Sequence, residues 1–216
     1  MTASSFRSPK KRGRISVFLS GRGSNFMAIH RAVTEGRIHA DIVLVHSNKP
    51  DAPGLAYAEA QGLKTLYLDA KNFSGREDYE SALIDRLRAE EVDLICLAGY
   101  MRILSPLICR EYLNRMLNIH PALLPSFPGL HVQKKAIEWG VRFSGATVHF
   151  VTPEVDMGPI VLQAVVPVLQ TDTEETLGAR ILIEEHKIYP EAVRLYFEGK
   201  LEVQGRRVFI LEDRSA

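Results

Sequence analysis

The feature that most constrains the fold is a regular alternation of short apolar runs with amphipathic segments over the first two-thirds of the chain. The strand-like runs span 14–20, 40–48, 63–69 and 92–100, and the helix-like segments between them span 24–36, 53–62 and 76–91. The last run, VDLICLAGY, is apolar almost throughout, which is typical of a central strand covered on both faces. Alternation at this spacing predicts right-handed βαβ units and an α/β fold with a doubly wound, mostly parallel sheet.

The pattern changes in the last third of the chain. Two strand-like runs at 145–152 and 158–169 have no helix between them, which predicts an antiparallel pair joined by a short loop. A helical pattern then extends from Thr173 to about Glu198, and the chain closes with a hairpin-like pattern around Gly205. We therefore expect an antiparallel C-terminal strand pair and a long C-terminal helix beside the parallel sheet.

The length and composition favour one globular domain. The chain has 216 residues, 46% of them hydrophobic, with a formal net charge of +1. We expect a single domain over 14–216, preceded by a flexible basic extension over 1–13. A basic arm of this kind can bind nucleic acid, but the balanced overall charge argues against a nucleic-acid partner. The N-terminal segment lacks the apolar stretch of a signal peptide, and no run reaches the length of a membrane span, so we expect no membrane association.

The two cysteines bear on the compartment and on catalysis. Cys96 lies within an apolar run and is expected in the core, and Cys109 follows in the next segment. Two cysteines make neither a disulfide framework nor a zinc site, and neither has a setting that would lower its pKa for nucleophilic attack. A reducing cytoplasm is the compartment that fits best.

A glycine-containing turn, SGRGSN at 20–25, joins the first predicted strand to the first predicted helix. Backbone N–H groups at a helix N-terminus, approached through glycines, suit a phosphate group. A dinucleotide fingerprint is not met, because neither Phe26 nor Met27 supplies the third glycine and the second strand does not end in a carboxylate. The P-loop sequence is also absent, so the turn favours a phosphomonoester over NAD or ATP. A plain tight turn capped by Ser24 stays open as the alternative.

Polar side chains gather at one predicted strand end and in a later loop. Asn118 and His120 are two apart on a strand and therefore point to one face, and the prolines after them limit the movement of the next loop. Asp156 lies in the loop between the last two strand-like runs, which can fold over the edge where active groups of parallel sheets gather. A carboxylate beside His120 favours the protonated imidazole, and an amide donor can stabilise an oxyanion. The three residues suit acyl or formyl transfer.

Other chemistries fit the same residues less well. No serine lies in a G-x-S-x-G elbow, which argues against a serine hydrolase. A metal could use His120, His131, His149 and Asp156, but no i,i+4 pair or C-x-x-C anchors such a site, and we expect no metal. The structural alternative, in which His120 only bonds to the backbone of a proline-rich turn, stays open for this residue taken alone.

Several separate motifs, in one order, give the chain a resemblance to a known family. They are SGRGSN (20–25), LAGYMRIL (97–104), LNIHPALLPSFPGLH (117–131), GATVHFVTPEVDMGPI (145–160) and EEHKIYP (184–190). With them the chain resembles the phosphoribosylglycinamide formyltransferases, folate-dependent enzymes of purine biosynthesis, from about residue 14 to about residue 200. The resemblance implies a Rossmann-like formyltransferase domain, 10-formyltetrahydrofolate as donor, glycinamide ribonucleotide as acceptor, and no metal.

The resemblance also implies roles for the matching positions. The catalytic trio corresponds to Asn118, His120 and Asp156. The contacts to the ribonucleotide correspond to Gly23, Ser24, Asn25 and Glu185. The folate contacts correspond to Arg76, Met101, Arg102, Ile103, Leu104, Asn118, Thr152, Pro153, Glu154, Val155 and Asp156. His131 either lines the pocket or begins a helix, and Met157 stands where a small residue is common in related enzymes.

Three alternatives stay open beside this interpretation. A methionyl-tRNA formyltransferase would carry an additional C-terminal RNA-binding domain, and a formyltetrahydrofolate deformylase an additional N-terminal domain, for which we expect no room in this chain. A non-catalytic phosphate-binding module would share the glycine turn but would have no need for the polar trio. We expect a monomer or weak homodimer that acts on small molecules.

Overall fold

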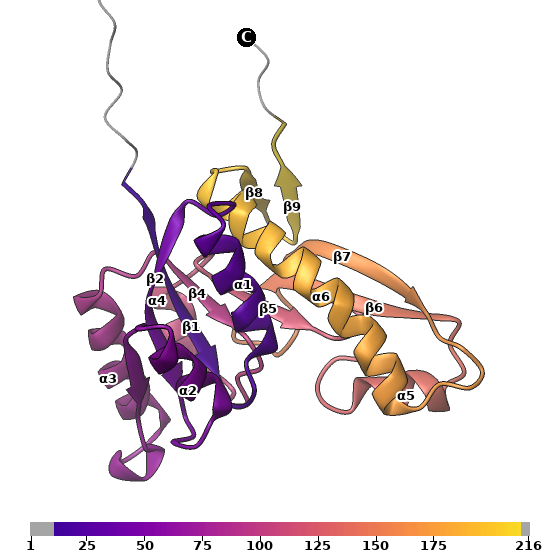
Figure 1. The fold of residues 1–216 in the computed structure, drawn as a ribbon, viewed down its shortest axis with the longest axis horizontal. Coiled ribbons are helices and arrows are strands. Elements are labelled where there is room, and N and C mark those ends of the chain that lie inside the picture. The colour runs from indigo at the N-terminus through magenta and orange to yellow at the C-terminus, as the bar shows by residue number, and fades with distance from the viewer. Residues whose placement is uncertain (1–10, 213–216) are drawn as a thin grey trace, which may run out of the picture.

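The structure, a computed structural model, describes residues 11–212, which form a nine-stranded sheet with helices on both faces (Figure 1). The strands are β1 (Gly13–Leu19), β2 (Ala40–Ser47), β3 (Thr65–Tyr67), β4 (Leu94–Leu97), β5 (Met116–His120), β6 (Phe143–Phe150), β7 (Ile160–Pro167), β8 (Leu201–Gln204) and β9 (Arg207–Ile210). Their order in the sheet is β3-β2-β1-β4-β5-β6-β7-β9-β8. The first five are parallel to one another, and β6 and β7 form antiparallel pairs, so the predicted mixed α/β sheet is confirmed.

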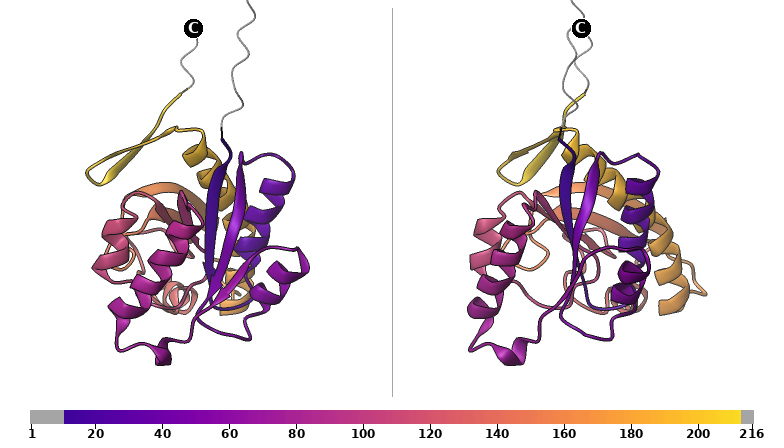
Figure 2. Two further views of the ribbon diagram at one scale, coloured as in Figure 1. Left: turned by 90° about the vertical axis from the view of Figure 1, so that its left-hand side faces the viewer. Right: turned by 60° about the vertical axis from the view of Figure 1, so that its left-hand side comes forward.

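Helices cover both faces of this sheet (Figure 2). They are α1 (Ser24–Thr34), α2 (Pro53–Ala60), the short 3-10 helix η1 (Ala70–Asn72), α3 (Arg76–Ala89), α4 (Pro106–Glu111), α5 (Val132–Glu138) and α6 (Glu174–Phe197). One core lies between the sheet and α1, α2, α5 and α6, and a second lies between the sheet and α3 and α4. Val17 of β1 packs in the first core and its neighbour Phe18 in the second. Burial on both faces explains why the central strand β4 is apolar at every position.

The elements differ from the sequence prediction at a few points. β3 has three residues, where the sequence predicted a strand over 63–69. The six-residue helix α4 was not predicted, because it is too short to show a helical period. Its start does carry a signal, since Ser105 is the N-cap, accepts a hydrogen bond from Leu107 N–H at 3.1 Å, and precedes a proline at the first helical position.

The boundary predicted between the basic extension and the domain is shifted. Residues 1–10 lie outside the described residues, but Lys11 and Arg12 already contact the folded unit. Lys11 Nζ lies 3.0 Å from Glu91 Oε2, and Arg12 Nε lies 2.8 Å from Asp41 Oδ1. Gly13 begins β1. Residues 11–13 therefore belong with the domain, whereas the sequence had assigned them to a flexible arm.

The sheet has a topological switch point between β1 and β4. From β1 the chain continues outward to β2 and β3, and it then returns to build β4 and β5 on the other side. Connections that diverge in this way leave a crevice outside the carboxyl ends of the strands, where ligands of open α/β sheets bind. Both the glycine turn after β1 and the segment after β4 lie here, and Ser20 N–H donates to the Gly99 carbonyl at 3.1 Å.

The long helix α6 holds the strand ends beside this crevice. It begins with a capping box, in which Thr173 Oγ1 accepts from Thr176 N–H at 3.3 Å and Thr176 Oγ1 accepts from Thr173 N–H at 2.9 Å. Near its middle, the buried Tyr189 hydroxyl lies 3.0 Å from the Leu97 carbonyl and 2.9 Å from the Leu117 carbonyl. One side chain of α6 is thus tied to β4 and to β5, the strands that carry the site described below.

Candidate active site

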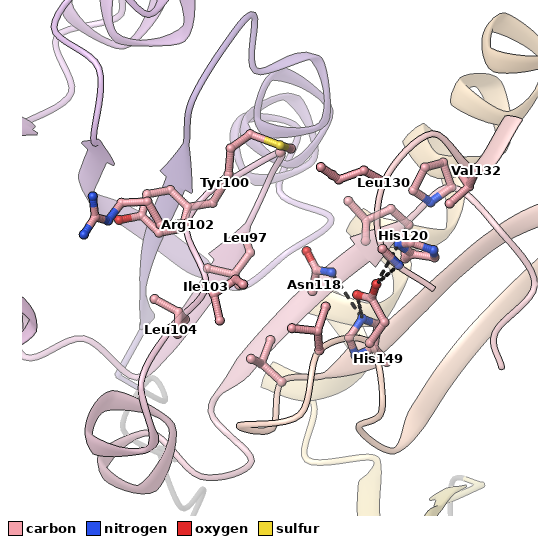
Figure 3. Close-up of a pocket in the computed structure, with 18 of the residues that line it drawn as sticks. Leu97, Tyr100, Arg102, Ile103, Leu104, Asn118, His120, Leu130, Val132 and His149 are labelled. Atoms are coloured by element: carbon pink, nitrogen blue, oxygen red, sulfur yellow. Dashed lines mark hydrogen bonds and ion pairs between the residues drawn. The ribbon is translucent and has the colours of Figure 1, made fainter. Parts of the chain in front are cut away.

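A pocket of about 500 Å³ lies at the carboxyl ends of β4 and β5 (Figure 3). It is lined mainly by the segment 99–104 after β4, the end of β5, residues 129–133, and the loop 151–156 between β6 and β7. Leu97 of β4 and His149 of β6 also line it. Most of the wall is apolar, and the polar groups cluster at one end, as in most small-molecule sites. The volume also falls within the usual range for such sites.

Strand β5 delivers two polar side chains to this end of the pocket. Asn118 and His120 both line it, as their spacing of two along the strand predicted. His120 is only 4% exposed, and its Nε2–H donates to the Phe127 carbonyl at 2.9 Å. The proline-rich loop after β5 therefore fixes the orientation of the imidazole. The ring thus bonds to the turn backbone through Nε2, while Nδ1 points away from the turn.

The loop between β6 and β7 folds over the same edge and brings Asp156 to this second nitrogen. Asp156 Oδ2 lies 3.4 Å from His120 Nδ1 and accepts from Gly129 N–H at 2.8 Å. Asp156 Oδ1 lies 3.7 Å from His149 Nε2. The backbone of Asp156 has a φ of 56°, in the left-handed region that residues other than glycine rarely adopt. Strain of this kind persists only where the surrounding structure holds it, and it is common at active sites.

The carboxylate remains charged at neutral pH. Burial alone would raise the pKa of Asp156. The rings of His149 and His120 and the Gly129 N–H outweigh burial, and together they hold this pKa below the ordinary value of an aspartic acid. The loop that strains the backbone thus also keeps a negative charge beside two imidazoles.

The protonation of His120 differs from the sequence expectation. Burial lowers the pKa of His120, and it outweighs the Phe127 carbonyl and the Asp156 carboxylate, which both raise it. The net pKa lies below the ordinary value of a histidine, so the ring is neutral at neutral pH. The expectation that Asp156 keeps His120 protonated is therefore wrong for the site as it stands, because desolvation is the larger effect.

His149 belongs to the same cluster, although the sequence analysis assigned it no catalytic role. It lies opposite Asn118 in the antiparallel pair of β5 and β6. Its Nδ1 is 2.9 Å from the Phe150 carbonyl, which can only accept, so Nδ1 carries the proton. Nε2 then accepts from Asn118 Nδ2 at 3.2 Å. This bond orients the amide of Asn118 and leaves its second N–H for the pocket.

The segment after β4 forms an apolar wall of the pocket. Met101, Arg102, Ile103 and Leu104 all line it, as predicted for folate contacts. Met101 is 62% exposed and Ile103 is 59% exposed, so neither side chain is ordinary core packing. The Arg102 guanidinium lies 4.6 Å above the Tyr79 ring, a cation–π arrangement. Within residues 11–212, Arg102 forms no ion pair with a carboxylate, which leaves its charge available to an anionic group.

The loop that carries Asp156 forms the opposite wall. All of its predicted folate contacts line the pocket, namely Thr152, Pro153, Glu154, Val155 and Asp156. Met157 instead points to a smaller neighbouring cavity, so its bulk does not crowd Asp156. The next residue, Gly158, has no room for a side chain, because a Cβ there would lie 1.7 Å from the Phe150 carbonyl oxygen.

The glycine turn lies at the switch point and does not line the pocket. Gly23 is the N-cap of α1 with a φ of 73°, and a Cβ there would lie 3.3 Å from Gly54 Cα at the start of α2. The turn therefore needs glycine both for its conformation and for its close approach to α2. Ser24 begins α1 and is half-buried.

Two predicted ribonucleotide contacts meet across a long stretch of sequence. Asn25 of α1 donates from Nδ2 to Glu185 Oε2 of α6 at 2.7 Å, and both side chains are buried. Burial raises the pKa of Glu185, and the hydrogen bond from Asn25 opposes it in part. Asn25 Oδ1 is buried with no hydrogen-bond partner, so an acceptor atom at this site is left for another donor.

The remaining candidate residues are Arg76, His131 and the two cysteines. Arg76 begins α3, is exposed and does not line the pocket, so its contact with a folate stays a prediction. His131 does line the pocket, and it is the N-cap of α5 with a φ of 57°. Both cysteines are buried and free, and burial raises the pKa of the Cys109 thiol to about 11, which opposes a nucleophilic role.

Among residues 11–212, no group of three His, Cys, Asp or Glu side chains is arranged to hold a metal ion. Over the same part of the chain, no helix has both the length and the apolar character needed to cross a membrane.

A switch-point crevice, an apolar pocket and an Asn–His–Asp cluster suited to an oxyanion define the class as an acyl- or formyl-transfer enzyme. The family model described as formyl transferase matches residues 13–193. The chain is similar to the crystal structure of glycinamide ribonucleotide transformylase 1 from Symbiobacterium toebii, with 50% sequence identity and a TM-score of 0.93. That similarity covers 97% of this chain and 100% of the other.

Curated relatives agree with this structural likeness. The phosphoribosylglycinamide formyltransferase of Escherichia coli is 44% identical over 196 residues, which are 91% of this chain and 92% of that protein. The trifunctional purine biosynthetic protein adenosine-3 of Drosophila melanogaster is 48% identical over 192 residues. Those residues are 88% of this chain but only 14% of the Drosophila protein. The chain belongs to the formyl transferase family and, within it, to the phosphoribosylglycinamide formyltransferases.

Proposed function

We propose that the protein transfers the formyl group of 10-formyltetrahydrofolate to the amine of glycinamide ribonucleotide in de novo purine biosynthesis. The products are formylglycinamide ribonucleotide and tetrahydrofolate. The observation that carries this proposal is the cluster of Asn118, His120 and Asp156 at the polar end of a pocket of folate size. Family membership supplies the substrate classes, and the cluster supplies groups for the chemistry.

The folate occupies the 500 Å³ pocket in this proposal. Met101 and Ile103 on one wall and Val155 on the other expose apolar surface, which suits a flat ring system. The Arg102 charge, held over Tyr79 and without a carboxylate partner in the described chain, suits the anionic tail. Arg76 approaches the same tail from the start of α3.

The ribonucleotide occupies the neighbouring site around the glycine turn. Its phosphate accepts from the backbone N–H groups of Gly23, Ser24 and Asn25 at the start of α1, where the helix dipole favours an anion. Glu185 and the unpaired Asn25 Oδ1 offer acceptors to the hydroxyl or amine groups of the ligand. The glycine turn thus binds one end of the acceptor and leaves its amine directed toward the pocket.

Formyl transfer then begins with attack of the neutral amine on the formyl carbon. A C–N bond forms and the carbonyl oxygen becomes an alkoxide. The Asn118 N–H that His149 does not hold donates to this alkoxide. The attacking nitrogen then carries a positive charge, and one of its protons passes to His120 Nδ1. The alkoxide raises the pKa of this ring, and Asp156 stabilises the imidazolium.

Collapse of the alkoxide completes the transfer. The bond between the formyl carbon and folate N10 breaks, and His120 gives up the proton it took from the attacking nitrogen, which reaches N10 through Asp156 or a water that Asp156 positions. The number of protons is unchanged, because the nitrogen that forms the new amide loses the one that N10 gains. Alignment of two substrates in adjoining sites accounts for much of the acceleration.

An absorbance assay for tetrahydrofolate release tests the proposal. Release from 10-formyltetrahydrofolate that depends on glycinamide ribonucleotide is the expected result. Release without any acceptor would instead indicate a deformylase. Absence of release with both substrates present would indicate a non-catalytic binding module.

Three further properties belong to the same proposal. The reaction needs no metal, so treatment with a chelator leaves the turnover unchanged. The protein acts in the cytoplasm and on small molecules alone. It is a monomer or a weak homodimer, which sedimentation over a range of protein concentrations measures.

A further inference from the structure

Ser20 stands between the two proposed substrate sites. It follows β1, opens the glycine turn and is 6% exposed. Its hydroxyl donates to Asn48 Oδ1 at 2.6 Å and accepts from Met101 N–H at 2.8 Å. Its own N–H donates to the Gly99 carbonyl at 3.1 Å. Ser20 therefore joins the ends of β1, β2 and β4 at the switch point of the sheet.

The position of this hydroxyl is fully determined by its two side-chain bonds. A serine hydroxyl has a single proton, which goes to Asn48, and the bond from Met101 occupies a lone pair. The residue is 6% exposed and both bonds are partly buried, so water has limited access to replace them. A shift of Ser20 therefore has to be followed by Met101 or to break a partly buried hydrogen bond, which costs about 1 kcal/mol.

The segment that contains Met101 is also held at other points. Ala98 N–H donates to the Phe18 carbonyl at 2.8 Å, the Tyr100 hydroxyl lies 3.2 Å from that of Tyr79, and Arg102 lies over the Tyr79 ring. Residues 98–105 lie between β4 and α4 without regular secondary structure. At the far end, Ser105 N–H donates to the buried Glu80 Oε1 at 2.8 Å. At the near end, Ser20 supplies the bonds to Gly99 and Met101. Among these contacts, the two bonds of Ser20 are the ones that join the folate wall to the glycine turn.

The glycine turn is held equally closely on its other side. Gly21, the residue after Ser20, accepts from Gly54 N–H at 3.1 Å, which ties the turn to the start of α2. Any adjustment of Gly21 to Asn25 around a phosphate is therefore passed to Ser20 rather than absorbed by a flexible connection.

We infer that Ser20 is a positioning residue that couples the two substrate sites, so that binding at the glycine turn favours the conformation of the Met101 wall that binds the folate. The inference rests on the proposed function, because it takes the glycine turn as the ribonucleotide site and the wall as the folate site. Coupling of this kind is reciprocal, so each ligand raises the affinity of the other by one factor. We expect a factor of at least about 5 in the wild-type protein.

Calorimetric titration with tetrahydrofolate and glycinamide ribonucleotide measures this factor. The pair cannot react, because tetrahydrofolate carries no formyl group. Each Kd is measured alone and with the other ligand at saturation. Ser20→Ala removes both side-chain bonds, and we expect its coupling factor to fall below about 2. Ser20→Thr keeps a hydroxyl and is expected to restore most of the coupling.

A matched control lies on the same strand. Ser16 is also buried, and its hydroxyl donates to the Leu44 carbonyl at 3.1 Å, remote from both binding segments. Ser16→Ala therefore removes a buried serine bond of β1 without touching either site, and we expect it to keep the wild-type factor. Thermal unfolding of each variant checks that it is folded. Asn48→Ala, which removes only the acceptor, provides a second variant, with an expected factor between those of Ser20→Ala and the wild type.

The outcomes separate the inference from the proposed function. A folded Ser20→Ala or Asn48→Ala variant that keeps the wild-type factor overturns the inference, as does a wild-type protein that binds both ligands independently. Equal loss of coupling in Ser16→Ala also overturns it, because the effect would then belong to β1 in general. A wild-type protein that binds neither ligand contradicts the proposed function itself.

Discussion

Two buried histidines lie at the same carboxyl edge of the sheet and differ in the partners of their rings. His46 of β2 is 0% exposed and His120 of β5 is 4% exposed. Each has one ring nitrogen at hydrogen-bond distance from a backbone carbonyl. The second nitrogen of His46 lies 2.8 Å from the Tyr79 hydroxyl, a neutral partner. The second nitrogen of His120 faces the Asp156 carboxylate at 3.4 Å.

This difference separates a structural histidine from one that can handle a proton. In the neutral ring of His46 both nitrogens are hydrogen-bonded, since one donates and the other accepts. Burial lowers the pKa of His46 to about 4, with a smaller contribution in the same direction from Arg102. The neutral ring of His120 points a lone pair at a carboxylate, an arrangement that only an added proton makes favourable. Burial alone therefore does not mark a catalytic histidine. What distinguishes His120 is a ring nitrogen that receives no hydrogen bond, a neighbouring carboxylate and an adjoining pocket.

The largest expected effect is on turnover. Asp156→Asn removes the negative charge that faces His120 Nδ1 but keeps the shape of the side chain. Asparagine also tolerates the positive φ at this position. We expect kcat to fall by roughly 10²- to 10⁴-fold, the scale of general acid–base catalysis. Tetrahydrofolate release at saturating concentrations of both substrates measures it. His120→Ala is expected to lower kcat by roughly 10²-fold or more for the same reason.

His46→Phe is the matched control for that experiment. Phenylalanine fills similar space beside Phe18, whose ring centroid lies 4.9 Å from that of His46. We expect kcat to stay within about 3-fold of the wild type, because His46 has no contact with the reacting groups. A His46→Phe variant as inactive as Asp156→Asn would remove the distinction between the two histidines.

The second effect concerns stability at acid pH. His46 has a pKa of about 4 in the folded protein, against about 6.5 in an unfolded chain. Between these values the unfolded chain binds a proton that the folded protein does not, so stability falls as pH drops from 6.5 to 4. Over the whole interval between the two pKa values, the free energy of unfolding falls by roughly 3 kcal/mol. Urea unfolding at pH 7.5 and pH 4.5 should show a smaller loss in His46→Phe than in the wild type.

The comparison of the two proteins isolates His46 from the other titrating groups. The pKa of His120 is also lowered, but His120 is present in both proteins and cancels in the difference. An equal loss of stability in wild type and His46→Phe would mean that His46 is protonated in the folded protein.

Much of the fold and part of this comparison could be predicted from sequence. Alternating strands and helices are local patterns, and Asn118 and His120 share a face through their spacing alone. The pairing of β5 with β6, which places His149 opposite Asn118, depends on tertiary structure and has no local signal. The short helix α4 was missed for lack of length.

The protonation states could not be predicted from sequence for a different reason. Burial and neighbouring charge move the pKa of His120 in opposite directions, so only the three-dimensional environment decides the sign. His46 lies within the apolar run ADIVLVHSN, and its partner Tyr79 lies 33 residues further along the chain. Nothing near His46 in the sequence indicates whether both of its ring nitrogens have hydrogen-bond partners.

A third effect concerns the hydrogen bond from the Tyr79 hydroxyl to His46 Nε2. Tyr79→Phe removes the hydroxyl at 2.8 Å from His46 Nε2 but keeps the ring beneath Arg102. A buried acceptor without its donor costs about 1–3 kcal/mol, and the Tyr100 hydroxyl at 3.3 Å can compensate in part. We expect a loss of about 1–2 kcal/mol in urea unfolding at pH 7.5, with kcat within about 3-fold of the wild type. An unchanged unfolding free energy would show that the Tyr79 bond is dispensable.

The smallest expected effect is at Tyr100, which belongs to both regions. Its hydroxyl lies 3.3 Å from His46 Nε2 and 3.2 Å from the Tyr79 hydroxyl, and its side chain also lines the 500 Å³ pocket. Both bonds are longer than that between Tyr79 and His46, which remains in Tyr100→Phe. We therefore expect a loss of stability below about 1 kcal/mol, an unchanged kcat and a KM for 10-formyltetrahydrofolate within about 3-fold of the wild type. A fall of kcat by tenfold or more would connect the His46 cluster to the reaction through Tyr100, because a side chain that only shapes the wall affects folate binding before it affects turnover.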